Sequence, residues 1–108
     1  MENTEIKIGE HTLTLRCTLR AAKMVNNMST PAGFTTAFQR LAMMDFDAYA
    51  TVIAAGSHAT VADVEKLLFE NGWPQLCAPL SRFVGMLANG GKAPSDDAAE
   101  GDNKPGEG

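Results

Sequence analysis

The sequence has little of several features that would point to particular functions. It has no excess of basic residues, since nine Lys and Arg stand against 13 Asp and Glu for a net charge of −4. A nucleic-acid partner requires a basic face, so this balance argues against one. No apolar run approaches the ~20 residues of a membrane span. The polar first segment, MENTEIKIGE, also lacks the apolar centre of a signal peptide, so we expect a cytoplasmic protein without a membrane partner.

Cysteines, histidines and catalytic motifs are equally scarce. Cys17 and Cys77 both stand at apolar positions of their segments, which favours two buried thiols over a disulfide. The two histidines, His11 and His58, fall in expected loops without a Cys, Asp or Glu at metal-ligand spacing. No phosphate loop or paired nucleophile and base is present. The sequence therefore predicts no catalytic residue, no cofactor and no metal ion, and an enzyme is the least favoured class.

The composition supports one small domain followed by a polar tail. Hydrophobic residues make up 44% of the chain, and a chain of this size buries somewhat over ~60% of its unfolded surface. Residues 1–89 carry seven Lys and Arg against eight Asp and Glu, whereas residues 90–108 carry two against five and no Leu, Ile, Val, Met or aromatic residue. We predict a single folded domain over residues 1–89 and a disordered acidic tail over residues 90–108.

Residues 4–17 alternate between apolar and polar side chains on both sides of a Gly9-Glu10 turn. Ile6 and Ile8 precede the turn, and Leu13 and Leu15 follow it. This period of two predicts a β-hairpin. A lone hairpin is marginal in water, so its apolar face must lie against helices.

The rest of the folded part has the period of short helices. The predicted bounds are about 19–27, 34–43, 46–55, 61–70, and from near 74 or 79 to 88. Thr18, Asp45 and Thr60 are suited to be N-caps, and Gly56 stands where a glycine after a helix belongs. Pro79 favours a helix start or restart close to it. The predicted fold class is α+β and mostly helical, with an N-terminal two-stranded β-hairpin packed on four to five short α-helices.

The stretch 34–56 is the longest proline-free run with helical periodicity, and we expect it to be the centre of the core. Four of its side chains are expected to face the hairpin and the final helix: Phe38, Leu41, Tyr49 and Ile53. Trp73 is expected to be a core anchor over the end of a neighbouring helix. Arg16, Arg20, Lys23 and Arg40 are expected to form a solvated face.

The methionines are the residues that most suggest a binding surface, while Trp73 has a binding hot spot as its alternative to a core anchor. Met24 and Met28 lie four residues apart on one predicted helix, and Met43 and Met44 lie at the junction of two others. Methionine side chains are flexible and polarisable, and adaptable binding surfaces use them often. The alternative is that they fill gaps in a small core. We predict that Met24, Met28, Met43 and Met44 contribute to a partner-binding groove.

The order of these parts resembles the tail assembly chaperone family of gene transfer agents and siphophage-like prophages. The segments that carry the resemblance are IKIGEHTLTLR, TLRAAKMV, FQRLAMMDFDAYATVIAAG, TVADVEKLLFENGW and LSRFVGML, which together span about residues 5–89. The resemblance implies a non-enzymatic protein of the bacterial host cytoplasm. It would bind the long, helical tape measure protein during phage tail assembly and help to recruit tail tube subunits.

Two other function classes stay open beside the chaperone. One is a structural tail component that remains in the particle. The other is a small regulatory or DNA-binding helical domain, against which the predicted helix 61–70 argues with its one Lys and three acidic residues. Whether the chain forms a homo-oligomer is also left open.

Overall fold

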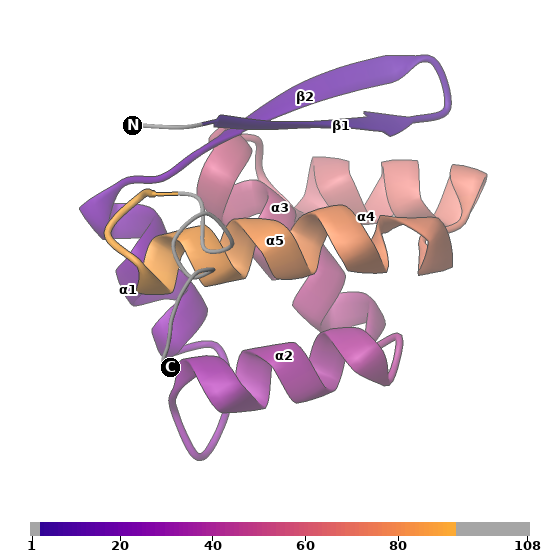
Figure 1. Ribbon diagram of the computed structural model, residues 1–108. Helices are drawn as coiled ribbons and strands as arrows, with labels where there is room; N and C mark the ends of the chain where they lie inside the picture. Colours follow the sequence, from indigo (N-terminus) through magenta and orange to yellow (C-terminus); the bar gives the residue numbers. More distant parts are fainter. Residues whose placement is uncertain (1–2, 93–108) are drawn as a thin grey trace, which may run out of the picture.

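The computed structural model describes residues 3–92, which form a β-hairpin lying over a group of helices (Figure 1). The elements in chain order are β1 (Asn3–Ile8), β2 (His11–Arg16), α1 (Leu19–Asn26), α2 (Phe34–Ala42), α3 (Phe46–Ser57), α4 (Val61–Asn71), the 3-10 turn η1 (Pro74–Leu76) and α5 (Cys77–Ala88). The predicted fold class is confirmed: an antiparallel two-stranded hairpin packs on short α-helices.

The hairpin has one buried face, as its alternating pattern predicts. Along β1 the buried residues are Thr4, Ile6 and Ile8, with exposed residues between them. Ile8 pairs with His11 across a two-residue turn, in which Gly9 has φ +63°. A positive φ at this first turn position suits the right-handed twist of the two strands and favours glycine. The buried face lies on the helices, where β2 contacts α3 and β1 contacts α5 and α4.

The three predicted N-caps are confirmed. The side-chain oxygens of Thr18, Asp45 and Thr60 accept hydrogen bonds from backbone N–H groups three residues later, at 3.0, 3.2 and 3.1 Å. Each cap satisfies a donor that has no partner inside its helix. The starts of α1, α3 and α4 are therefore local properties of the sequence.

Helix α3 is the centre of the core. Every residue from Ala48 to Gly56 is buried except Thr51, which is half-buried. A helix that is apolar on all sides must be surrounded, and α3 indeed packs on α4, α1 and β2, with smaller contacts to α2 and α5. The prediction that stretch 34–56 centres the core holds for this second half.

The first half of that stretch lies elsewhere. Helix α2 packs mainly on α5 and sits on the side of the molecule opposite the hairpin (Figure 1). Phe38 is 37% exposed, and only Ala37 and Leu41 of α2 are fully buried. Helix α2 thus packs on the final helix, α5, as expected. The expectation that Phe38 and Leu41 also face the hairpin is wrong, because α5 lies between α2 and the strands.

The predicted helix end at Gly56 is also wrong. Helix α3 continues through Ser57, and His58 takes the left-handed conformation with φ +65°. Gly56 is instead buried inside the helix. A Cβ atom there would lie 2.7 Å from Phe83 Cζ and 2.9 Å from Leu15 Cβ. The residue is glycine because β2 and α5 approach the helix backbone closely at this point.

Helix α5 starts before Pro79 and ends at two glycines. Pro79 is the third residue of the helix, where its missing N–H would have no partner in any case. At the other end Gly91 N–H donates to Met86 O at 2.7 Å and Gly90 N–H to Leu87 O at 3.4 Å. These two bonds form a Schellman motif, with Gly90 at φ +70°. The first residues of the predicted tail thus cap α5, and residues 93–108 lie outside the described part.

Cys17 lies between β2 and α1, and Cys77 is the first residue of α5. Cys17 is buried and Cys77 is half-buried, so the prediction of two buried thiols is met fully at Cys17 only. No helix within residues 3–92 is both long and apolar enough to span a membrane.

Candidate functional site

The most exposed of the predicted site residues lie where α2 meets α3. Met43 is 77% exposed and Met44 is 52% exposed, although both carry large apolar side chains. The connection from α2 to α3 consists of Met43, the C-cap of α2, then Met44, and then Asp45, the N-cap of α3. We call Met43 and Met44, with the three side chains that fix them (Arg40, Asp45 and Trp73), the methionine junction.

The backbone of the methionine junction is a Schellman motif. Asp45 N–H donates to Arg40 O at 3.0 Å, and Met44 N–H donates to Leu41 O at 3.1 Å. Met44 therefore occupies the left-handed position, with φ +60°, that helix ends usually give to glycine or asparagine. The Met44 side chain at this position is about half exposed.

Arg40 ties the junction to the loop before α2. Its Nε donates to Asp45 Oδ2 at 2.7 Å, while Nη1 donates to Ser29 Oγ at 2.7 Å and to Met28 O at 3.0 Å. The hydrogen bond between the two side chains lowers the pKa of Asp45 and raises that of Arg40. Asp45 Oδ1 meanwhile caps α3. One carboxylate therefore fixes both the ion pair and the direction in which α3 starts.

Trp73 supports the junction from the other side. Its Nε1 donates to Met44 O at 3.0 Å, and its ring meets Phe46 edge-on with centroids 4.9 Å apart. The tryptophan thus holds the carbonyl of a residue 29 positions earlier in the chain. The prediction of a core anchor is met in part, because Trp73 packs half-buried against the core and also fixes Met44.

Met24 and Met28 differ from the other two methionines in their burial. Both are half-buried and pack against the core cluster. The carbonyl of Met28 is linked to the junction through Arg40. The structure thus links the backbone of Met28 to Arg40 of the junction, while the side chains of Met24 and Met28 contribute to packing.

Besides the bond from Met44 N–H, the carbonyl of Leu41 accepts two hydrogen bonds from side chains. Tyr49 Oη donates at 2.8 Å, and Cys77 Sγ donates at 3.8 Å. Burial, followed by the contact with the Cys77 thiol, raises the pKa of Tyr49 to about 12. The hydroxyl is therefore kept neutral and locks the end of α2 onto α3 and α5.

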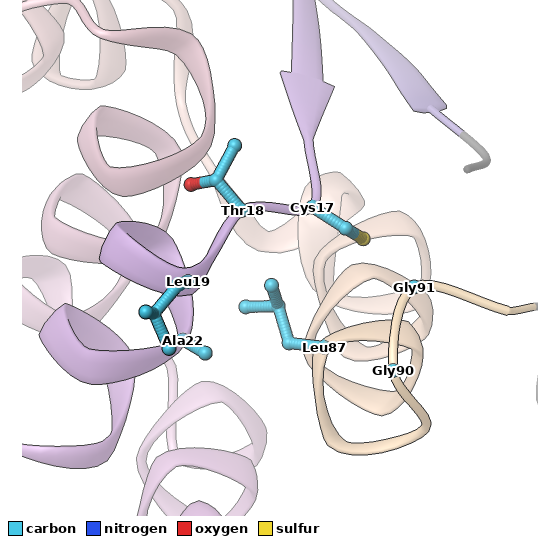
Figure 2. A pocket seen from close by; sticks show the side chains of 7 residues that line it. All are labelled: Cys17, Thr18, Leu19, Ala22, Leu87, Gly90 and Gly91. Carbon is cyan, nitrogen blue, oxygen red and sulfur yellow. The ribbon is translucent and has the colours of Figure 1, made fainter.

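An apolar pocket is lined by residues outside the methionine junction. This pocket of about 230 Å³ is found between the start of α1 and the end of α5. Figure 2 shows Leu19 and Ala22 of α1 across from Leu87 of α5. None of its lining residues is charged, and the hydroxyl of Thr18 already accepts the N-cap bond. Among residues 3–92 there is also no cluster of three His, Cys, Asp or Glu side chains that could hold a metal ion.

The sequence pattern indicates Met43 and Met44 but not the contacts that fix them. Arg40 is expected on a solvated face, and its ion pair with Asp45 is not predicted because a separation of five residues is not a helix spacing. It forms because the Schellman turn brings Asp45 back over the last turn of α2. The sequence indicates this turn only weakly, through an N-cap residue, Asp45, two positions after the end of the predicted helix 34–43. Nothing in the sequence pointed to the contact between Trp73 and Met44.

The exposed part of the methionine junction is apolar. Its one cation and its nearest anion neutralise each other in the Arg40–Asp45 pair, and the exposed side chains are apolar. Such a surface suits the apolar face of a partner helix. Comparison of the chain with protein-family models, curated proteins and solved structures finds no match in any of the three.

Proposed function

We propose that this protein is a tail assembly chaperone of a phage or gene transfer agent. In this role it binds the tape measure protein through the methionine junction and assists assembly of the tail tube. The observation that carries the proposal is the exposure of two adjacent methionines on a backbone held rigid by Arg40, Asp45 and Trp73. The resemblance of the chain to that family supplies the identity of the partner.

The left-handed conformation of Met44 gives this proposal a specific argument. A side chain other than glycine costs roughly 1 kcal/mol in this region, so folding alone would favour glycine or asparagine here. The methionine is nevertheless present and exposed. Its side chain thus opposes the local backbone preference without filling the core, as expected for a side chain retained for binding.

The conformation also provides a variant that separates binding from folding. Met44→Gly removes the side chain and relieves the left-handed strain, so its free energy of unfolding should stay within about 1 kcal/mol of the wild type or rise. Loss of a methionine that becomes buried in a complex costs on the order of 1.5–3 kcal/mol, which is roughly tenfold or more in affinity. We expect that loss for a complex with the tape measure protein, measured by calorimetry on the co-purified proteins.

Two other exposed apolar residues supply matched controls. Phe69 is 81% exposed on α4 and Leu19 is 79% exposed on α1, both outside the junction. Phe69→Ser and Leu19→Ser should leave the affinity unchanged. Equal losses for all three variants would mean that general surface hydrophobicity drives the association. Failure of the wild type to form any soluble complex with the tape measure protein would overturn the proposed function.

A further inference from the structure

The hairpin presents two open edges, and that of β1 has an unusual pattern. The two-residue turn makes Ile8 and His11 a hydrogen-bonded pair, as are Ile6 with Leu13 and Thr4 with Leu15. The residues between them on β1 consequently point their N–H and C=O groups outward: Asn3, Glu5 and Lys7. Within residues 3–92 no backbone group outside the hairpin bonds to them. The edge is a template for another strand.

Two of the three side chains along this edge are charged. Glu5 and Lys7 are exposed, two residues apart on the outer face of the hairpin. Their neighbours across the hairpin are the uncharged Thr14 and Thr12. The described residues contain no ion pair that involves either charge. The hairpin therefore leaves one negative and one positive side chain next to each other along a free strand edge.

We propose that β1 pairs antiparallel with β1 of a second copy of this chain, about a two-fold axis at Ile6. In this register Glu5 of each copy lies opposite Lys7 of the other. Both pairs consist of residues with outward backbone groups, so each exchanges two N–H···O=C bonds. Each also places opposite charges directly across the strands, which stabilises a pair. The result is a four-stranded sheet whose buried face continues from one copy to the other.

Neighbouring registers are disfavoured by the same rules. A shift by two residues in either direction puts Glu5 opposite Glu5 or Lys7 opposite Lys7, and like charges directly opposite destabilise a sheet. A shift by one residue opposes outward backbone groups to inward ones and removes the hydrogen bonds. The edge of β2 presents Thr12, Thr14 and Arg16, which offer no opposite charges to a second copy. The charge pattern therefore selects β1 with β1 in one register.

The geometry leaves the methionine junction accessible. Figure 1 shows all the helices on one side of the hairpin, with α2 farthest from the strands. Pairing through β1 thus uses a part of the molecule remote from Met43 and Met44. The inference is independent of the proposed function and stands or fails without a tape measure protein.

Charge exchange at Glu5 and Lys7 tests the pairing. Sedimentation equilibrium of the full chain should show a monomer–dimer equilibrium at concentrations up to about 1 mM, a range that covers weak association. Lys7→Glu and Glu5→Lys each turn both attractive pairs into repulsive ones, and each should raise the dimer dissociation constant about tenfold or more. The double variant restores opposite charges across the axis and should return the constant to near its wild-type value. Lys66→Glu and Glu65→Lys make the same charge changes on α4 and should have no effect.

Amide hydrogen exchange identifies the edge directly. The amides of Glu5 and Lys7 should become protected as protein concentration rises, whereas those of Thr12 and Thr14 should not. A wild type that stays monomeric to about 1 mM overturns the proposal. So does failure of the double variant to restore dimerisation. Protection of Glu5 and Lys7 that does not depend on concentration also overturns it, since the edge would then be covered by the chain's own residues.

Discussion

Gly56 and Met44 are each a residue type that the local backbone conformation disfavours. Gly56 stands inside a helix, where alanine is usually better by roughly 1 kcal/mol. Met44 stands in a left-handed position that favours glycine. The first case is explained by packing, because Phe83 and Leu15 occupy the space of a side chain at residue 56. The second has no packing explanation, since Met44 is half exposed.

Gly56→Ala should therefore destabilise the protein, against the usual effect of this change in a helix. Overpacking of a filled core typically costs about 1–3 kcal/mol, which exceeds the gain in helix propensity. Urea denaturation monitored by circular dichroism measures the difference. The added Cβ would lie nearest to the Phe83 ring, so the cost should fall when Phe83→Leu is also present. An equal cost in both backgrounds would place the conflict elsewhere.

Tyr49 gives a prediction about pH. Its pKa is raised to about 12 in the folded protein, against about 10 in an unfolded chain. Its favourable contribution is therefore complete below pH 10 and is lost as the pH rises from about 10 to about 12. Tyr49→Phe should lose about 1 kcal/mol at pH 8 with the hydrogen bond to Leu41 O. That deficit should shrink between pH 8 and pH 11 in urea denaturation, and a deficit constant over this range would contradict the assignment.

At the scale of elements, the end of α2 and the start of α3 are built as one unit. The Schellman turn of α2 delivers Asp45 to the N-cap of α3, and the same carboxylate pairs with Arg40 of α2. The end of α2 thus positions the carboxylate that caps α3, and this carboxylate in turn binds Arg40 of α2. Trp73, from the connection after α4, closes the unit over Met44 O. This arrangement holds two exposed methionines in place without burying them.

The two roles of Asp45 can be separated by two substitutions. Asp45→Asn keeps a good N-cap and loses the ion pair with Arg40, whereas Asp45→Ala loses both and should be about 1 kcal/mol less stable than the Asn variant. The pKa of Asp45 is lowered in the folded protein, chiefly by its hydrogen bond to Arg40. The ion pair therefore contributes above the unfolded pKa near 3.9 and is lost as the pH falls through the lowered value.

The deficit of Asp45→Asn should consequently be present at pH 6 and shrink towards pH 3 in denaturation experiments. Asp63→Asn is the control, because Asp63 lies near the start of a helix and makes no ion pair among the described residues. Its effect on the free energy of unfolding at pH 6 should be small. A pH-independent deficit at residue 45 would show that the ion pair contributes nothing measurable.

At the scale of the whole molecule, the two proposed surfaces lie on opposite sides. The hairpin edge and α2 are separated by the layer that contains α5 (Figure 1). A dimer formed through β1 would therefore carry both methionine junctions on the same side of the four-stranded sheet, beyond the helices. For a long partner with repeated apolar helix faces, two linked sites raise the apparent affinity without any new contact.

If both proposals hold, Lys7→Glu should weaken binding to an immobilised tape measure protein while preserving the affinity of a single site. We expect the wild type to dissociate at least about tenfold more slowly than the variant at high surface density, and equally fast at low density. Surface plasmon resonance at two densities makes the comparison. Identical dissociation at both densities would show that dimerisation adds no second contact with the partner.

The helix starts and the hairpin were predictable because their causes are local. Thr18, Asp45 and Thr60 each bond to an N–H three residues away, and the Gly9 turn needs only its own backbone freedom. The predicted end of α3 at residue 55 is too early, because Gly56 resembles a glycine that ends a helix. Its actual role is to leave room for Phe83 and Leu15 beside the helix backbone. Met43 and Met44 were identified as site residues from residue type and position, whereas their support by Trp73 required the fold.

The sequence by itself determined which segments become strands and helices, which of their faces are apolar, and that acidic residues outnumber basic ones. The first two are properties of residues within about one helical turn of each other, so periodicity and caps reveal them. Only the tertiary structure decided that α3 is enclosed while α2 lies outermost, and that Arg40, Asp45 and Trp73 converge on two exposed methionines. Such contacts join residues up to 29 positions apart, and the packing of whole elements sets their geometry.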